Sequence, residues 1–315
     1  MDKFQFVEGA WEKLSCAEVN HNEYALSLRI WPWHESLHET IQAHLQPAQV
    51  LAYALASSAD KANATELFLA LDATSIERAM KTLQSSLLAA FSQQPLNYAL
   101  MPLAERNTRP RLMVFDMDST LIQMECIDEI ARQVGCYEQV SEITEAAMRG
   151  ELDFSQSLRR RVTLLNGLAE ADFLKLTQQL PLTDGVLSVV EWARQNDCRI
   201  AVVSGGFVPF VEHLKQQLGL DFAFANQLEV TAERLTGEVL GEIVDGAKKR
   251  EILIRLREQL GLSAAQVWAV GDGANDLLML GEAGLGVAFD AKPKVRAEAF
   301  AVIDQADLSE LLNLL

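Results

Sequence analysis

The sequence predicts an α/β protein with a Rossmann-like core of parallel strands, a helical cap inserted after the first core strand, and a small N-terminal α+β domain. Three observations lead to this prediction. Beyond residue 110, apolar runs typical of buried strands alternate with helical stretches, as in a parallel sheet with crossover helices. Residues 125–181 carry apolar side chains at helical spacing and include no convincing strand. The first hundred residues follow a separate pattern of their own.

The N-terminal domain is predicted to span residues 1–105. Its strands alternate like half-buried strands, a helix is expected after each of the first two, and Ser75 is the expected N-cap of the second helix. Only three or four strands are predicted in this domain. The predicted elements are strands at 24–30, 66–71 and 96–100 and a helix at 75–93. Charged and turn-forming residues at 104–110 are typical of a linker.

The second domain is predicted at residues 106–315, with its core at 111–123 and 183–315 and the cap at about 124–182. A polar turn between two alternating runs in 227–244 predicts a β-hairpin that interrupts the sheet crossover. The core strands are predicted at Leu112–Phe115, Arg199–Val203, Val267–Val270, Leu285–Phe289 and Phe300–Ile303.

Charge and composition exclude several classes of function. A formal net charge of −17 over 315 residues disfavours broad contact with nucleic acid or an anionic membrane surface. No apolar run approaches the roughly 20 residues needed to cross a bilayer. The first residues lack the basic and apolar regions of a secretory signal, so a cytoplasmic location is expected. The four cysteines show no C-x-x-C spacing and are interpreted as reduced thiols.

Polar groups follow three of the predicted core strands at the point where each ends. They are Asp116 and Asp118 after the first strand, Ser204-Gly205-Gly206 after the second, and the segment Gly271–Asp276 after the third. A single Asp-x-Asp is also typical of a turn or a helix cap. Because ligands of open parallel sheets bind beyond the carboxyl ends of the strands, three such tips on adjacent strands predict a site.

The residue types at these tips indicate phosphate chemistry. Carboxylates from Asp116, Asp118 and either Asp272 or Asp276 supply the hard oxygen ligands that Mg²⁺ prefers. Two like charges about 4 Å apart repel by roughly 4 kcal/mol at an effective dielectric constant near 20, so a carboxylate nucleophile needs positive charge beside a phosphate. One lysine of the segment 247–250 is expected to provide it, while Lys248 and Arg250 are interpreted as solvated. Asp116 would then be a feasible nucleophile that forms a phosphoryl-aspartate.

These residues resemble the haloacid dehalogenase superfamily, whose four motifs match in order from Leu112 to near the C-terminus: Asp116-Met117-Asp118-Ser119-Thr120, Ser204, Lys249 and Gly271–Asp276. The aspartate two residues after the nucleophile points to its phosphatases and phosphomutases. The resemblance implies that Asp116 is the nucleophile and that Asp118 is the general acid and then the general base. It also implies Mg²⁺ held by Asp116, the Asp118 backbone carbonyl and Asp272, phosphate contacts from Ser204, Gly205, Lys249 and Asn275, and support from Asp276.

The cap insertion is similar to that of the phosphoserine phosphatases, on the strength of Glu125 and the segment 148–161. That resemblance implies that Glu125 binds the substrate ammonium and Arg161 its carboxylate, with Met148 and Phe154 as an apolar lid. Arg159 and Arg160 are interpreted as solvated. The implied activity is Mg²⁺-dependent hydrolysis of the small molecule O-phospho-L-serine, the last step of serine biosynthesis.

Two alternatives remain open from the sequence. The same nucleophile could transfer phosphate to another alcohol or act on another small phosphomonoester. The N-terminal residues 1–105, which match no catalytic pattern, could form a ligand-sensing or dimerisation module, and a homodimer is then one expected state. The family resemblance implies that these residues could be a reduced or divergent form of the ferredoxin-like regulatory domain that some relatives carry at this position.

Overall fold

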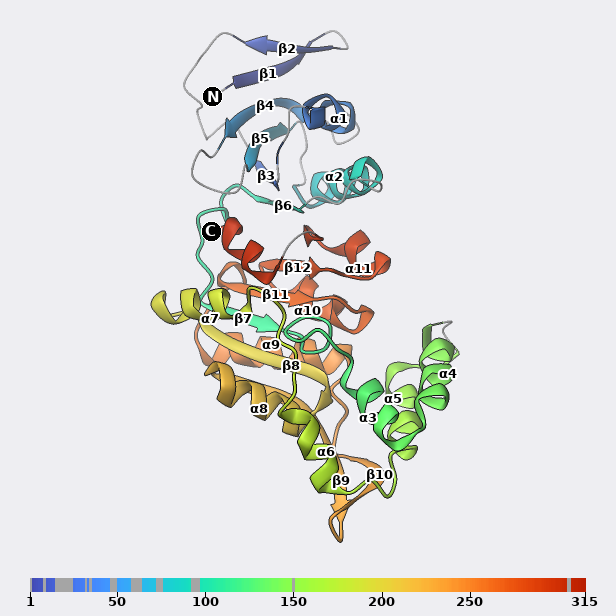
Figure 1. Cartoon of the computed structure of the whole chain (residues 1–315). Helices are drawn as coiled ribbons and strands as arrows, with labels where there is room; N and C mark the ends of the chain where they lie inside the picture. The colour runs from blue at the N-terminus through green and yellow to red at the C-terminus, as the bar shows by residue number, and fades with distance from the viewer. Residues whose placement is uncertain are drawn as a thin grey trace. The chain divides into compact units, whose positions relative to one another are not determined.

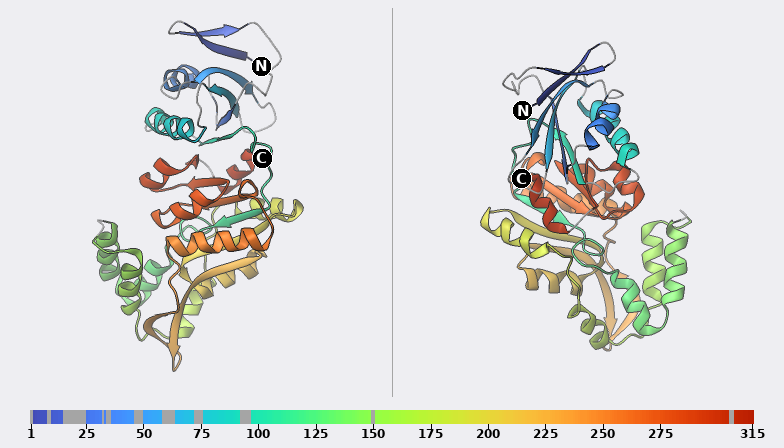
Figure 2. Two further views of the ribbon diagram at one scale, coloured as in Figure 1. Left: turned by 180° about the vertical axis from the view of Figure 1, so that it is seen from behind. Right: turned by 45° about the horizontal axis from the view of Figure 1, so that its top comes forward.

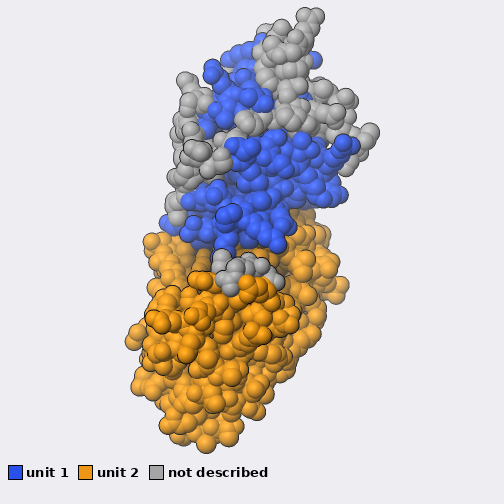
Figure 3. Space-filling model, turned by 90° about the vertical axis from the view of Figure 1, so that its right-hand side faces the viewer, with its two compact units in different colours: residues 1–109, 285–315 blue, residues 110–284 orange. Residues whose placement is uncertain are grey.

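The structure of the chain is a computed structural model (Figure 1; Figure 2). It describes residues 2–7, 10–14, 25–31, 33, 36–45, 50–57, 64–71, 76–91, 97–148, 151–304 and 307–315. The chain divides into two compact units, coloured separately in Figure 3: unit 1 comprises residues 1–109 and 285–315, and unit 2 comprises residues 110–284. None of the helices in the described ranges is long and apolar enough to cross a membrane.

Unit 1 is built around an antiparallel sheet with the strand order β6-β3-β5-β4-β1-β2. From β3 to β6 the elements follow the order β-α-β-β-α-β, which is that of a ferredoxin-like unit. The elements are β1 (Asp2–Val7), β2 (Ala10–Leu14), β3 (Leu26–Trp31), α1 (Ser36–Leu45), β4 (Val50–Ser57), β5 (Thr65–Leu71), α2 (Ile76–Phe91) and β6 (Asn97–Pro102).

The prediction of three or four N-terminal strands was too low, because the described residues contain six. The predicted strands are confirmed as β3, β5 and β6, and a helix follows each of the first two. Three strands were not predicted: β1, β2 and β4. Of these, β4 alternates alanine with larger residues, and alanine is depleted in strands, so its sequence carries a weak strand signal. Tyr24 and the predicted N-cap Ser75 lie outside the described residues.

Residues 285–315 group with the N-terminal residues, although the sequence placed them in the domain 106–315. The reason is backbone pairing: β13 runs antiparallel to β6, with Ala301 opposite Ala99. In addition, the side-chain amide of Gln84 on α2 donates a hydrogen bond to the carbonyl of Ala299 over 2.7 Å. The segment contains β12 (Leu285–Phe289), α11 (Pro293–Glu298), β13 (Ala301–Ile303) and a 3₁₀ helix, η5 (Leu308–Leu314). The two strands predicted here from apolar runs are confirmed.

Unit 2 contains the parallel strands β11-β7-β8-β9, with β10 antiparallel to β9 at the edge. In β7, at the centre of these strands, all four residues are buried, and Val114 lies opposite Ala201 on one side and Ala269 on the other. The strands are β7 (Leu112–Phe115), β8 (Arg199–Phe207), β9 (Phe222–Thr231), β10 (Arg234–Leu240) and β11 (Val267–Gly271). The helices of the core are α7 (Val186–Gln195), α8 (Val208–Leu218), α9 (Gly246–Gln259) and α10 (Leu277–Glu282), with 3₁₀ turns η3 (Ala264–Gln266) and η4 (Ala274–Asp276). The predicted parallel core and hairpin are confirmed.

The insertion after β7 is helical, as predicted. Its first three helices, within residues 126–163, lie together (Figure 1), whereas the fourth, at 170–177, packs with Phe173 against Phe210 of α8. Its helices are α3 (Cys126–Val134), α4 (Tyr137–Met148), α5 (Phe154–Thr163) and α6 (Glu170–Thr177). A capping box fixes the start of α5, where the Asp153 side chain accepts a hydrogen bond from the backbone N–H of Gln156. The hairpin β9–β10 supports the insertion, because Leu235 exchanges backbone hydrogen bonds of 2.8 and 2.9 Å with Gly167 and Leu168.

Candidate active site

The site is centred on Asp116, the first residue beyond β7. Its backbone N–H donates to the carbonyl of Val270 on β11, which ties it to the neighbouring strand tip. The ammonium of Lys249, on the first turns of α9, lies 2.8 Å from Oδ1 of Asp116 and donates to Oδ1 of Asp276 over 2.7 Å. Lys249 and Asp276 are fully buried, and Asp116 is 5% exposed. The structure therefore brings together residues from three distant parts of the chain that the sequence had grouped only by motif.

Three carboxylates form a compact cluster here. Asp116, Asp272 and Asp276 each offer an oxygen atom, and these atoms lie within 4.8 Å of one another. Such a set of buried oxygen donors fits Mg²⁺. Asp276 is already engaged on both oxygens, since Oδ1 accepts from Lys249 and Oδ2 accepts from the N–H of Gly273 over 3.0 Å. Its engagement suits a residue that positions Lys249, the supporting role that the family resemblance implies.

Burial shifts the pKa of three groups at the site, Asp116, Asp118 and Lys249. It raises the pKa of Asp116 well above the ordinary value, with Asp276 reinforcing the rise and Lys249 opposing it. Burial also raises the pKa of Asp118 to about 7, and the nearby Glu125 carboxylate adds to that rise. Although burial lowers the pKa of Lys249, Asp116 and Asp276 raise it above the ordinary value, so the lysine stays charged. A carboxyl group that titrates near neutral pH can act both as a proton donor and as a proton acceptor.

The end of β8 forms the opposite side of the site. Ser204 is fully buried, and its Oγ accepts a hydrogen bond of 2.8 Å from the N–H of Gly206, which leaves the hydroxyl proton available for donation. A Cβ atom on Gly206 would lie 2.9 Å from the side chain of Met117 and 3.1 Å from Oδ2 of Asp118. Glycine is therefore required for this close approach of the loop to the Asp116–Asp118 segment.

Two buried polar residues that hold the site were not identified from the sequence. Asn226 on β9 donates from its amide to the carbonyls of Gly205 and Gly206 over 2.8 and 3.2 Å, and its Oδ1 accepts from the N–H of Val244 over 2.8 Å. The hydroxyl of Thr120 lies 3.4 Å from Oδ1 of Asp272. Asparagine is unusual in a strand, so its place in the apolar run of β9 was a signal for Asn226.

The insertion brings its predicted residues to the same region of unit 2. Glu125 precedes α3 and is exposed, and one of its oxygens accepts from the hydroxyl of Ser119 over 2.8 Å. Burial lowers the pKa of Arg161 on α5, and three carboxylates oppose this decrease: Asp128, Glu125 and Asp118. The guanidinium of Arg161 thus lies within the electrostatic range of both Glu125 and Asp118.

Phe154, at the start of α5, contacts the β8 loop. A Cβ atom on Gly205 would lie 2.7 Å from Cζ of the Phe154 ring, so only glycine permits this contact. Asn275 is half-buried in η4, and its carbonyl lies close to Gly246, the first residue of α9. Met148 ends α4, and its side chain lies outside the described residues.

The remaining basic residues singled out by the sequence lie away from the cluster. Arg159 and Arg160 are exposed on α5. Lys248 pairs with Glu242 and Glu251 over 2.6 and 2.7 Å, and Arg250 pairs with Glu282 over 2.7 Å. Their interpretation as solvent-facing charges is consistent with this arrangement, and Lys249 is the lysine of this segment that enters the site.

The fold and the site define a class of protein. The family of haloacid dehalogenase-like hydrolases matches residues 110–284, which is the whole of unit 2. The chain belongs to this family.

Three comparisons show which branch of the family it joins. It is 49% identical over 211 residues to a probable phosphoserine phosphatase of Schizosaccharomyces pombe, covering 66% of this chain and 71% of the relative. It is 46% identical over 220 residues to phosphoserine phosphatase of Haemophilus influenzae, covering 70% of each chain.

The unliganded crystal structure of a probable phosphoserine phosphatase from Vibrio cholerae is also similar. It has a TM-score of 0.69 and 35% sequence identity, and the match covers 94% of this chain and 88% of that one. Within its family the chain groups with the phosphoserine phosphatases, as predicted, and is a phosphoric monoester hydrolase.

Proposed function

We propose that this chain hydrolyses O-phospho-L-serine to L-serine and phosphate through a covalent phosphoryl-aspartate on Asp116. The observation that carries the proposal is the fully buried Lys249 held between Asp116 and Asp276 at the strand tips. The names and identities of the relatives support the substrate. A place at the last step of serine biosynthesis and a cytoplasmic location stay predictions.

In the first half-reaction, a carboxylate oxygen of Asp116 forms a bond to phosphorus while the bond from phosphorus to the serine oxygen breaks. Asp118 donates its proton to the departing oxygen, which suits a carboxyl whose pKa burial raises to about 7. Lys249, at 2.8 Å from Asp116, reduces the repulsion between the nucleophile and the phosphate dianion.

In the second half-reaction, a water oxygen forms a bond to phosphorus and the bond between phosphorus and Asp116 breaks. Asp118, now ionised, accepts the proton of that water, so the group returns to its starting state. The available hydroxyl proton of Ser204, the N–H of Gly205, the Lys249 ammonium and the Asn275 amide are proposed to hold the phosphate oxygens in both steps.

The oxygen cluster fits Mg²⁺, which Asp116 and Asp272 would hold by their side chains and Asp118 by its backbone carbonyl. When bound, the ion supplies positive charge that offsets the charge developing on the transferred phosphoryl group. Asp276 would stay outside this ligand set, because both of its oxygens already accept hydrogen bonds from the chain.

Recognition of the amino acid is proposed to depend on opposite charges from the insertion. Arg161 would bind the substrate carboxylate as a two-pronged donor, and Glu125 would accept from the substrate ammonium. Phe154 and Met148 would cover the apolar part of the substrate. The contact of Phe154 with Gly205 supports this part of the proposal, because it brings the insertion against the proposed phosphate loop.

Phosphate release in the presence of Mg²⁺ tests the proposal. The panel comprises O-phospho-L-serine, O-phosphoethanolamine and glucose 6-phosphate, and the first is expected to have the highest kcat/KM. An Asp116→Asn variant should lose at least about 10³-fold in kcat, since the nucleophile is removed. Asp172→Asn, which changes an exposed aspartate of α6, is the matched control. A preference for the sugar phosphate would contradict the substrate, and normal turnover by Asp116→Asn would contradict the mechanism.

A further inference from the structure

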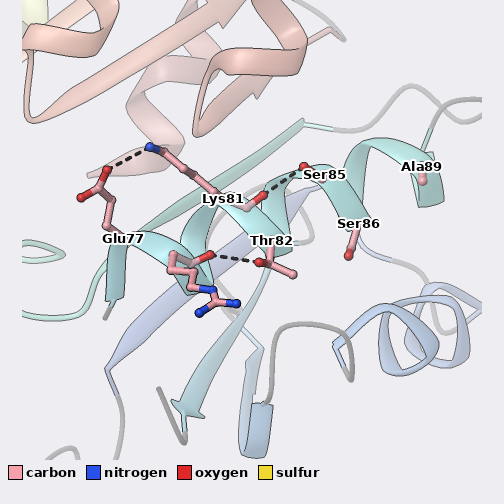
Figure 4. Close-up of a pocket in the computed structure, with 7 residues that line it drawn as sticks. Glu77, Lys81, Thr82, Ser85, Ser86 and Ala89 are labelled. Atoms are coloured by element: carbon pink, nitrogen blue, oxygen red, sulfur yellow. Dashed lines mark hydrogen bonds and ion pairs between the residues drawn. The ribbon is translucent and has the colours of Figure 1, made fainter. Parts of the chain in front are cut away.

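Unit 1 carries two hollows that the proposed function does not use. The broader one, of about 800 Å³, lies over α2 (Figure 4). Its polar groups are directed to their own helix: Lys81 pairs with Glu77 over 2.9 Å, and the hydroxyls of Thr82 and Ser85 donate to backbone carbonyls one turn earlier. This surface is open and its charges are paired, so it has the character of an ordinary solvated helix face.

The helices α1 and α2 cover one face of the unit 1 sheet (Figure 2). The second hollow, of about 320 Å³, is lined by residues of the other face. On β3, the fully buried Leu26, Leu28 and Ile30 alternate with Ser27 and Arg29. Successive side chains of a strand point to opposite faces, so Ser27 and Arg29 share the second face. Both line this hollow, together with Glu66 of β5, Met101 of β6, and Arg106 and Thr108 of the following segment.

Within the described ranges, some polar groups of this hollow have hydrogen-bond partners and others do not. Both oxygens of Glu66 are bonded, because Arg106 binds them as a two-pronged donor and the hydroxyl of Ser27 donates to one of them over 2.6 Å. Arg106 is further fixed by the ring of Phe68, whose centroid lies 5.6 Å from the guanidinium carbon. Glu66 therefore has little acceptor capacity left for Arg29, although the two residues are partners across β3 and β5.

Arg29 is the unsatisfied member of the set. Within the described part of the chain, its guanidinium makes no hydrogen bond or ion pair, although the side chain is half-buried. Burial lowers the pKa of Arg29, with Glu66 opposing the decrease, so the surroundings leave this charge incompletely compensated. A guanidinium carries five N–H donors in a planar fork that matches an oxyanion. The hollow is also lined by Arg109 and by Leu314 and Leu315 of the C-terminal segment. With three arginines and one glutamate, its side chains are net positive in a chain whose formal charge is −17.

We propose that this hollow, named here the Arg29 pocket, binds a small oxyanion, a carboxylate or a phosphate, through the guanidinium of Arg29. The volume holds about ten waters at roughly 30 Å³ each and lies at the lower end of ligand pockets, so the occupant is a molecule of about the size of an amino acid. Arg106 and Glu66 form the rigid floor, and Thr108 offers a hydroxyl at the side. The site lies within unit 1 and does not depend on the chemistry proposed for unit 2.

Calorimetric titration of the full chain tests the Arg29 pocket. The probes are malonate for a carboxylate, inorganic phosphate for a phosphate, and L-serine for an amino acid. At least one should bind, and Arg29→Gln should weaken that binding about tenfold or more, because a charged hydrogen-bonding partner is lost. Arg29→Lys should recover only part of the affinity, since the planar fork is absent. Arg194→Gln, which changes an exposed arginine on α7, should bind like the wild type.

A second variant separates loss of the site from loss of the fold. Met101→Trp fills the hollow from β6 and leaves Arg29 in place, so it should also abolish the binding. Both variants should retain the wild-type far-ultraviolet circular dichroism and kcat, because neither residue belongs to the proposed active site. Binding of malonate or of phosphate identifies the oxyanion. If Arg29→Gln left the isotherms of all three probes unchanged, the Arg29 pocket would be overturned. Any phosphate or serine that binds at the active site instead would still bind to this variant.

Discussion

Replacing Lys249 by methionine tests the electrostatic core of the site. The substitution keeps an unbranched side chain of similar length and removes a fully buried ammonium that lies 2.8 Å from Asp116 and 2.7 Å from Asp276. Two carboxylates then face each other without a cation. At 4.8 Å, the upper limit for the oxygens of this cluster, the repulsion is about 3 kcal/mol at an effective dielectric constant near 20.

The protein can avoid that repulsion by protonating one carboxyl. Holding a proton at pH 7 on a group whose ordinary pKa is about 3.9 costs roughly 4 kcal/mol, at about 1.4 kcal/mol per pH unit. Both responses agree with the roughly 3–5 kcal/mol observed when one partner of a buried ion pair is removed. We therefore expect Lys249→Met to lower the free energy of unfolding by about 4 kcal/mol at pH 7.

The pH dependence has a definite sign. Burial already raises the pKa of Asp116 in the wild type, and Lys249 opposes that rise, so removing the lysine raises this pKa further. Near neutral pH, the folded variant therefore binds more protons than the folded wild type. The destabilisation is then greatest above that raised pKa and decreases as the pH falls towards about 4. Acidification should therefore bring the unfolding free energies of variant and wild type closer together.

The assay is urea unfolding between pH 5 and 8 in the presence of EDTA, so that no bound cation replaces the lost charge. Adding Asp276→Asn to Lys249→Met should restore part of the stability, since one of the two facing carboxylates is gone. Lys248→Met is the matched control, because this neighbouring lysine pairs at the surface and should matter little. We also expect kcat/KM of Lys249→Met to fall by about 10³-fold or more. A stability loss below about 1 kcal/mol, or one that does not vary with pH, would refute this reasoning.

Three further predictions concern other parts of unit 2. Asn226→Leu should lower the free energy of unfolding by about 3 kcal/mol and reduce kcat, because it leaves the carbonyls of Gly205 and Gly206 and the N–H of Val244 without partners. Urea unfolding and phosphate release measure these effects. An unchanged kcat would contradict the role of Asn226 in supporting the loop. Arg161→Lys should raise KM for O-phospho-L-serine about tenfold or more without affecting O-phosphoethanolamine, which lacks the carboxylate; equal effects on both would argue against a carboxylate contact. The hydrogen bond from Arg250 lowers the pKa of Glu282, so its stabilisation is present above the unfolded pKa of about 4.3 and lost as the pH falls through the lowered folded value. Glu282→Gln should therefore cost up to about 1 kcal/mol at pH 7 and almost nothing near pH 3, and a difference that persists in acid would contradict the pairing.

The core strands could be predicted because their signal is local. The runs at 112–115, 200–203 and 267–270 are buried on both faces, so each is continuously apolar and ends abruptly in polar residues. The helical insertion could also be predicted, because its apolar residues recur at helical spacing. By contrast, β4 was missed because its alanines give little strand preference, and the grouping of residues 285–315 depends on which strand edge β13 pairs with.

The site shows the same division. The order of the motifs along the chain predicted that Asp116, Ser204, Lys249 and the Asp272 segment meet in one site. A phosphate site needs oxygen ligands, a cation and glycine turns, and these can come from segments that lie far apart in the sequence. That Lys249 is fully buried between Asp116 and Asp276, while the half-buried Lys248 pairs with Glu242, followed only once α9 was placed against β7 and η4.

The class of fold and the class of reaction followed from the sequence, since strand tips, residue types and motif order are properties of the chain read along its length. The role of Asp116 as the nucleophile is a prediction that rests on the same features. The tertiary structure was needed to show which polar side chains find hydrogen-bond partners after folding and which do not. Asn226 supports the Gly205–Gly206 loop, and Arg29 is a candidate anion ligand, only through neighbours that lie far away in sequence. The physical reason is that a polar side chain acquires its role from burial and from the partners available there, and neither is encoded in the residue alone.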